Sequence, residues 1–161
     1  DIPALEIVEE FREYNAKAII MATVKADPSL AEFLPKIYED PEAFRKVFNT
    51  AMRAWVNNSL DFGNIESFEE LKKRVGDAME AIRSSQGREG VVVVFTSGGA
   101  IAASLANIVA ISSADAIRLN RQIVNTSVTR YVFDDHRITL AGFNAIDHLK
   151  LERDPSLITW Y

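Results

Sequence analysis

The turn Ser97-Gly98-Gly99 is the strongest candidate for a functional site in this sequence. It directly follows the apolar run Gly90–Thr96 and leads directly into a helical pattern. A helix that begins after a strand points unpaired N–H groups and the positive end of its dipole at an anion, and glycines let the backbone approach it closely. The turn therefore predicts an anion site, although the spacing is equally consistent with glycines that only allow tight packing. It is not a Gly-x-Ser-x-Gly nucleophile elbow, because Phe95 takes the place of the first glycine.

The other candidate groups have simple structural interpretations when only their spacing is considered. Glu13 ends an acidic stretch of the kind that usually forms a solvated face. His136 lies in a predicted hairpin turn and should be exposed, while His148, beside Asp147, is expected to make a structural hydrogen bond. Two histidines so placed predict no metal site. The absence of cysteine excludes disulfides and cysteine nucleophiles.

Helical patterns dominate the first half of the chain. Residues 3–25 are compatible with either a helix or a loop, and a short helix is expected near 30–38. Asp40 as N-cap and Pro41 at the first position predict a long helix. Its apolar face should form core, and comprises Phe44, Val47, Phe48, Ala51, Met52, Trp55 and Val56.

The second half adds strands to the helices. The pair Ser67 and Glu70 has the spacing of a capping box and predicts a helix ending between residues 84 and 87. The β-branched run 90–96 predicts a strand covered by helices on both faces. A helix should follow Gly98-Gly99, a short one should be capped by Ser112 or Ser113, and residues 126–133 and 138–143 should form a hairpin.

These elements predict an α/β fold with three layers, α/β/α, around a mixed, mainly parallel sheet that ends in a β-hairpin. The 161 residues suit a single domain, 48% of them are hydrophobic, and no linker marks a boundary. A net charge of −5 argues against nucleic-acid partners. No apolar run is long enough to span a bilayer, so no membrane partner is expected. A cytoplasmic location is the default, and a homodimer is left open.

Four ordered segments together resemble the C-terminal part of the histidine phosphatases, the phosphoglycerate mutase-like superfamily. The resemblance covers roughly residues 64–150. Its segments are Glu66-Ser67-Phe68-Glu69-Glu70, Val91–Gly99, Asn125-Thr126-Ser127-Val128 and Asn144-Ala145-Ile146-Asp147-His148-Leu149. They are similar to the family's Glu-Ser helix start, Ser-His-Gly-Gly turn, Asn-x-Ser-Val segment and Asn-x-x-x-His-Leu segment. Phe11-Arg12-Glu13 extends the resemblance upstream to a Leu-x-Glu element.

The resemblance implies phosphoryl transfer or hydrolysis of a small phosphate ester through a phosphohistidine, without a metal or other cofactor. It implies that Glu13 protonates the leaving oxygen, that Ser97 lies in the catalytic pocket, and that Gly98 and Gly99 bind the substrate phosphate. Two departures qualify this. The family's Arg-His-Gly nucleophile motif does not occur in the chain, and Ser97 stands where the family has a second histidine.

We therefore expect residues 1–161 to be the C-terminal part of a larger histidine phosphatase-like domain, whose nucleophile is supplied by a missing N-terminal segment. The chain alone is then expected to be inactive as a phosphatase or phosphomutase. A non-catalytic module that binds phosphate or another protein, and that derives from the same fold, is the alternative. The identity of the phosphate ester is not readable from the sequence.

Overall fold

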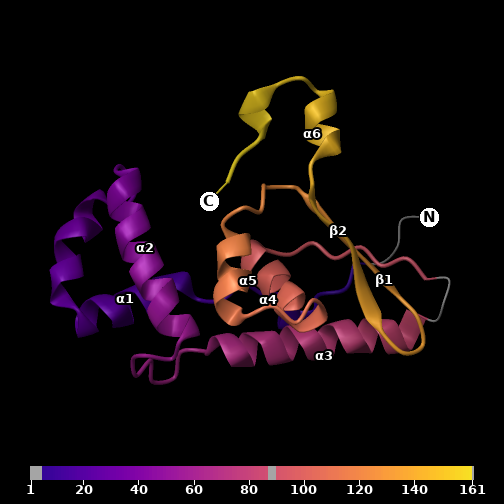
Figure 1. The fold of residues 1–161 in the computed structure, drawn as a ribbon, viewed down its shortest axis with the longest axis horizontal. Helices are drawn as coiled ribbons and strands as arrows, with labels where there is room; N and C mark the ends of the chain where they lie inside the picture. The colour runs from indigo at the N-terminus through magenta and orange to yellow at the C-terminus, as the bar shows by residue number, and fades with distance from the viewer. Residues whose placement is uncertain (1–4, 87–89, 161) are drawn as a thin grey trace. The chain divides into compact units, whose positions relative to one another are not determined.

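A computed structural model describes residues 5–86 and 90–160 (Figure 1). The chain divides into two compact units, one formed by residues 14–71 and the other by the residues up to 13 together with those from 72 onward. Helix α3 (Phe68–Gln86) runs from the first unit into the second. The structure is a mixture of helices and strands, as expected.

The unit of residues 14–71 is helical. It contains α1 (Ala16–Ala26), the 3-10 helix η2 (Pro28–Lys36) and α2 (Pro41–Val56), which pack against one another. Asp40 caps α2 as predicted, since its Oδ1 accepts a hydrogen bond from the Glu42 backbone N–H at 2.8 Å. The residue range that was open between helix and loop therefore contains α1.

An aromatic cluster forms the core of this unit. The Trp55 side chain is 1% exposed, and its indole Nε1–H donates to the Glu66 carbonyl at 2.7 Å. The Tyr14 ring lies 4.7 Å from the Trp55 ring, and the Phe68 ring meets it edge-on at 5.4 Å. The predicted core face of α2 is confirmed for Val47, Ala51, Met52 and Trp55, whereas Phe44, Phe48 and Val56 are only partly buried.

The capping box at the start of α3 is also confirmed. The Glu70 carboxylate accepts hydrogen bonds from the backbone N–H and the hydroxyl of Ser67 at 2.7 and 2.8 Å, and the Glu70 N–H donates to Ser67 Oγ at 3.2 Å. These hydrogen bonds from Ser67 lower the pKa of the Glu70 carboxyl. Four residues of sequence thus fix where α3 begins.

The other unit contains α4 (Gly98–Ile108), α5 (Ser113–Asn120), the strands β1 (Val128–Phe133) and β2 (Ile138–Ala145), and α6 (Asp147–Leu151). Short 3-10 helices, η1 (Glu9–Phe11) and η3 (Pro155–Leu157), lie towards its ends. Helix α4 packs against α5, which Ser112 caps, and β1 pairs antiparallel with β2 in the predicted hairpin. Within residues 5–86 and 90–160, these two strands form the sheet.

The hairpin is attached to α4 through a pair of hydroxyls. Ser104 Oγ of α4 and Tyr131 Oη of β1 share a hydrogen bond of 2.5 Å. Burial raises the pKa of the Tyr131 phenol, and the hydrogen bond with Ser104 partly offsets that rise. The face of β1 that carries Tyr131 therefore points toward the helices, while Val128 and Val132 on its other face are exposed.

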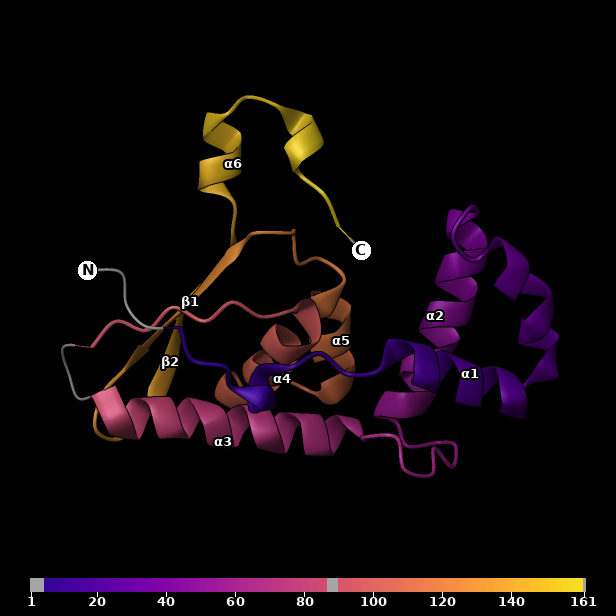
Figure 2. The ribbon, with the colours of Figure 1, turned by 180° about the vertical axis from the view of Figure 1, so that it is seen from behind.

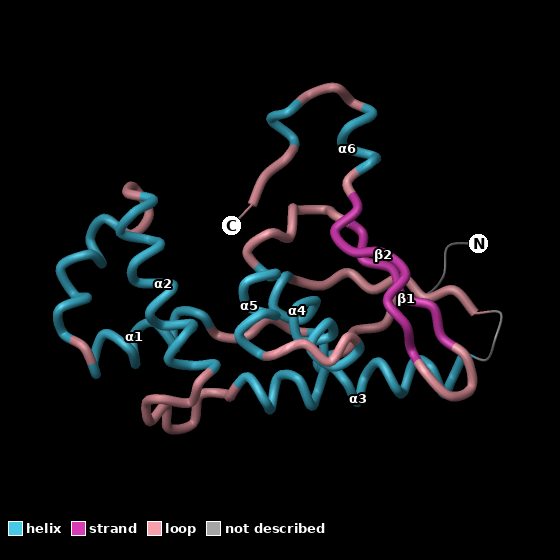
Figure 3. Tube along the Cα trace, in the orientation of Figure 1, coloured by secondary structure: helices cyan, strands magenta, loops and turns pink. Residues whose placement is uncertain are grey.

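The run Gly90–Thr96 differs from its prediction. It belongs to no helix or strand, and it appears as loop between α3 and α4 (Figures 2 and 3). Val91, Val93 and Phe95 are 89%, 71% and 88% exposed, so the prediction that helices cover both faces is wrong here. The physical reason is that a β-strand needs a partner for its backbone, and no strand of the described residues pairs with this one. The predicted three layers and parallel sheet are consequently not seen.

This exposure yields a direct prediction. The double variant Val93→Thr, Phe95→Ser is expected to change the free energy of unfolding of the chain by less than about 0.5 kcal/mol, because both side chains already lie in water. Leu105→Ala, at a side chain 2% exposed in α4, should cost about 2–5 kcal/mol. Urea denaturation followed by circular dichroism compares them. A double variant as destabilised as Leu105→Ala would show that the segment is packed in solution.

Candidate phosphate site

The turn Ser97-Gly98-Gly99 forms the start of α4, as predicted. Ser97 is the N-cap residue, with extended backbone angles, but its side chain makes no capping hydrogen bond. Its Oγ is buried and has no hydrogen-bond partner within the described part of the chain. Buried hydroxyls normally have a hydrogen-bond partner, so Ser97 Oγ is available to bind a ligand atom.

Glu13 lies at the same helix end, although 86 residues separate it from Gly99. Its Oε2 accepts a hydrogen bond from the Gly99 backbone N–H at 3.0 Å. The first N–H groups of a helix have no partner within the helix, and the dipole favours a negative group there. The carboxylate of Glu13 thus takes the role that the Ser97 side chain leaves open, and the two predicted catalytic residues lie at one helix end.

The two glycines differ in what surrounds them. A Cβ at Gly98 would collide with the side-chain Oδ1 of Asn120, the last residue of α5, so this glycine allows α5 to approach α4. Gly99 is buried, and its N–H points at Glu13. Tight helix packing therefore explains the glycine at position 98. At position 99, by contrast, the backbone N–H binds a carboxylate, as expected for an anion-binding helix start.

The segment that carries Glu13 is held by two side chains that the sequence did not single out. Arg74 Nη1 donates to the carbonyls of Glu10 and Arg12 at 2.5 and 2.9 Å. Thr96 Oγ1 donates to the Phe11 carbonyl at 2.6 Å. The sequence indicated the role of Arg74 only by placing an arginine one turn after the capping box. An arginine is common on any polar helix face, so this position did not predict the contact.

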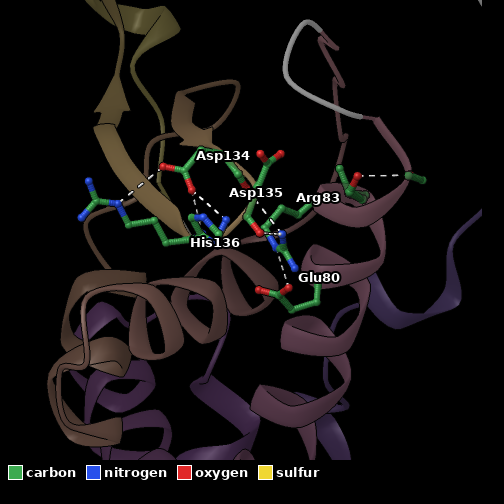
Figure 4. Close-up of polar contacts among 8 residues, drawn as sticks. Glu80, Arg83, Asp134, Asp135 and His136 are labelled. Atoms are coloured by element: carbon green, nitrogen blue, oxygen red, sulfur yellow. Dashed lines mark hydrogen bonds and ion pairs between the residues drawn. The ribbon is translucent and has the colours of Figure 1, made fainter.

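Both histidines have the structural positions predicted for them. His136 is exposed in the hairpin turn, where its backbone N–H donates to Asp134 Oδ1 at 2.8 Å (Figure 4). This hydrogen bond and a second one from the Arg137 N–H lower the pKa of Asp134. His148 Nε2 lies 3.3 Å from Thr126 Oγ1. Across residues 5–86 and 90–160, no group of three or more His, Asp or Glu side chains is arranged to hold a metal ion.

Arg83 of α3 fixes this hairpin turn. Its Nη1 donates to the Asp135 carbonyl at 2.7 Å, and its Nε lies 2.7 Å from Glu80 Oε2 (Figure 4). Asp134, Asp135 and Glu80 are thus engaged in shaping the turn rather than in forming a ligand site.

Two hollows lie within the unit of residues 14–71. One of about 260 Å³ is lined by residues between Asn58 and Glu70, and another of about 240 Å³ by residues between Thr50 and Ser59.

A family model describes most of the chain. The model of the histidine phosphatase superfamily (branch 1) matches residues 7–146, which include Glu13, the turn at Ser97 and the hairpin. The chain belongs to the histidine phosphatase superfamily. The predicted membership of this superfamily is thereby confirmed, and the match reaches upstream to the acidic segment. Searches of curated proteins and of solved structures return no significant match. In the described residues, no helix of this superfamily member is long and apolar enough to cross a membrane.

Proposed function

We propose that this chain forms the acid and one wall of the phosphate pocket in a histidine phosphatase-like domain that hydrolyses or transfers phosphate esters. The observation that carries the proposal is the hydrogen bond of 3.0 Å between the Glu13 carboxylate and the Gly99 N–H, which joins a candidate acid to a candidate phosphate-binding turn. Superfamily membership supplies the reaction class.

In the proposed reaction, an imidazole nitrogen from an Arg-His-Gly segment outside these residues attacks the phosphorus of the ester. The ester P–O bond breaks, and the leaving oxygen takes the carboxyl proton of Glu13. The oxygen of a water molecule then attacks the phosphorus of the phosphohistidine, and its proton passes to the Glu13 carboxylate. The P–N bond breaks, which regenerates the imidazole and releases inorganic phosphate. The Gly98 N–H and the Ser97 hydroxyl would stabilise the phosphoryl oxygens, while the Gly99 N–H donates to Glu13.

The exposed run Gly90–Thr96 supports the proposal that further strands complete the domain. The exposure of the side chains alternates along this run: Val91, Val93 and Phe95 are 89%, 71% and 88% exposed, while Val92 and Val94 are 38% and 41% exposed. Apolar side chains on both faces are typical of a central strand in a three-layer α/β/α sheet. We propose that this run pairs there with the strand that carries the nucleophile.

The test compares the 161-residue chain with a joined protein, in which an apolar strand and Arg-His-Gly segment from a superfamily member precede Asp1. The chain alone is expected to show no turnover of p-nitrophenyl phosphate, because an acid and a pocket wall cannot form the phosphoenzyme. The joined protein is expected to turn it over and to form an acid-labile phosphohistidine. Turnover by the chain alone that Glu13→Gln abolishes would contradict the role of an external nucleophile.

A second candidate function is a module that binds phosphate without catalysis. It is favoured by Ser97, since a serine hydroxyl donates a hydrogen bond but adds no positive charge where the superfamily's pattern has histidine.

Ser97→His in the joined protein distinguishes the two functions. For an enzyme, the added cationic contact is expected to raise kcat/KM by about 10-fold to 100-fold. For a module, the parent protein should bind inorganic phosphate in calorimetry, and the folded variant should remain without turnover. An enzyme whose rate is unchanged or lower in the folded variant would contradict the alignment of Ser97 with the histidine.

A further inference from the structure

Arg74 and Glu13 are connected through the backbone of the acidic segment. Arg74 lies in α3, one turn after Glu70 of the capping box, and its Nη1 donates to the Glu10 and Arg12 carbonyls at 2.5 and 2.9 Å. The Arg12 carbonyl belongs to the peptide group that precedes Glu13. A guanidinium has a planar, rigid set of donors, so two carbonyls held by one nitrogen fix the path of the chain between them.

Thr96 holds the same segment from another side. Its hydroxyl donates to the Phe11 carbonyl at 2.6 Å, and Thr96 directly precedes the Ser97 turn. Three successive anchors at Glu10, Phe11 and Arg12 thus precede the carboxylate that meets the Gly99 N–H. The side chains of residues 5–13 are mostly exposed, so little packing orders this segment. Without the anchors, fixing the Glu13 carboxylate in one place would cost the conformational entropy of the whole segment.

We infer that Arg74 is a positioning residue for Glu13, and that it sets the place of the Glu13 carboxylate at the start of α4 through the carbonyls of residues 10 and 12. The inference rests on the proposed function, because it assigns Arg74 to the acid of that site. Arg74 acts through the backbone and does not itself touch the substrate.

The position of the Glu13 carboxylate can be followed in the chain itself by the chemical shift of the Gly99 amide in proton–nitrogen NMR spectra. When Glu13 is replaced by glutamine, the Gly99 signal is expected to move, because the carboxylate that accepts its hydrogen bond is lost. This movement in the otherwise unchanged chain is the reference, and the same substitution is made in each variant below.

Arg74→Met keeps the length of the stem but removes the donors, and is expected to reduce the movement to less than roughly half of the parent value, because hydrogen bonds weaken steeply with misalignment. Arg74→Lys should retain more of it, since one donor group can still reach a carbonyl. Lys73→Met is the matched control from the same helix, where Lys73 pairs with Asp77 at 2.6 Å, and should leave the movement unchanged.

Thr96→Val tests the second anchor and serves if Arg74→Met does not fold. It should also reduce the Gly99 movement. Full movement in folded Arg74→Met, or in Thr96→Val where only that variant folds, would overturn the inference while leaving the proposed function intact. If the Gly99 signal of the parent chain does not respond to the change at Glu13, both the inference on Arg74 and the proposed function are overturned. If the signal moves as expected but the joined protein shows no turnover, only the proposed function is contradicted.

Discussion

Glu13→Gln in the joined protein is expected to lower kcat/KM for an alkyl phosphate, such as glycerol phosphate, by about 10²-fold to 10⁴-fold. Glutamine can still accept the Gly99 hydrogen bond through its amide oxygen, but it has no proton to give to the leaving alkoxide. Steady-state phosphate release measures the effect.

The leaving group separates proton donation from simple positioning. The nitrophenolate of p-nitrophenyl phosphate departs as a stabilised anion and needs little protonation, so the same variant should lose much less activity on this ester. Glu10→Gln is the matched control from the same acidic segment, and it should behave like the parent with both esters. Equal losses with both esters would contradict the general-acid role of Glu13, and so would a Glu10 variant that is equally impaired.

Trp55→Ala is expected to destabilise the unit of residues 14–71 by about 3–5 kcal/mol. The substitution empties a site that is 1% exposed, removes the ring contacts with Tyr14 and Phe68, and leaves the Glu66 carbonyl without its indole donor. Losses of this size are a large fraction of the stability of a small domain.

Urea denaturation followed by circular dichroism gives the free energy, and NMR signals from α1 and α2 assign the loss to this unit. Trp55→Phe retains most of the apolar volume and should cost clearly less. Met21→Ala, at a side chain that is 50% exposed, is the surface control and should cost less than about 0.5 kcal/mol. A Trp55→Ala variant as stable as the Met21 control would contradict the buried aromatic cluster.

Local rules predicted α2 and α3 because their determinants lie within a few residues. Asp40 caps α2 with its own carboxylate, and Ser67 and Glu70 satisfy one another across a single turn. The hairpin was predictable for the same reason, since Asp134 organises the turn between two strands that are adjacent in sequence.

Non-local determinants were harder to read. The run Val91–Phe95 has every intrinsic property of a buried strand, yet strand formation and burial depend on partners, and none lies among the described residues. For Gly98, the sequence left a ligand role and tight packing equally open, and in the structure a Cβ at this position would meet Asn120 of α5. The meeting of Glu13 with Gly99 followed only from family resemblance, because nothing in the spacing of residues 86 positions apart indicates contact.

The exposed run Gly90–Thr96 also bears on how this chain behaves at high concentration. Seven consecutive residues contain four valines and a phenylalanine, no charge and no proline. Such a window matches the composition of segments that stack into cross-β fibrils, in which copies of one strand supply each other's hydrogen bonds. Covering Val91, Val93 and Phe95 would therefore also protect the chain from self-association. A charged residue in place of Val93, whose side chain lies in water, would act as a gatekeeper and keep the isolated chain dispersed.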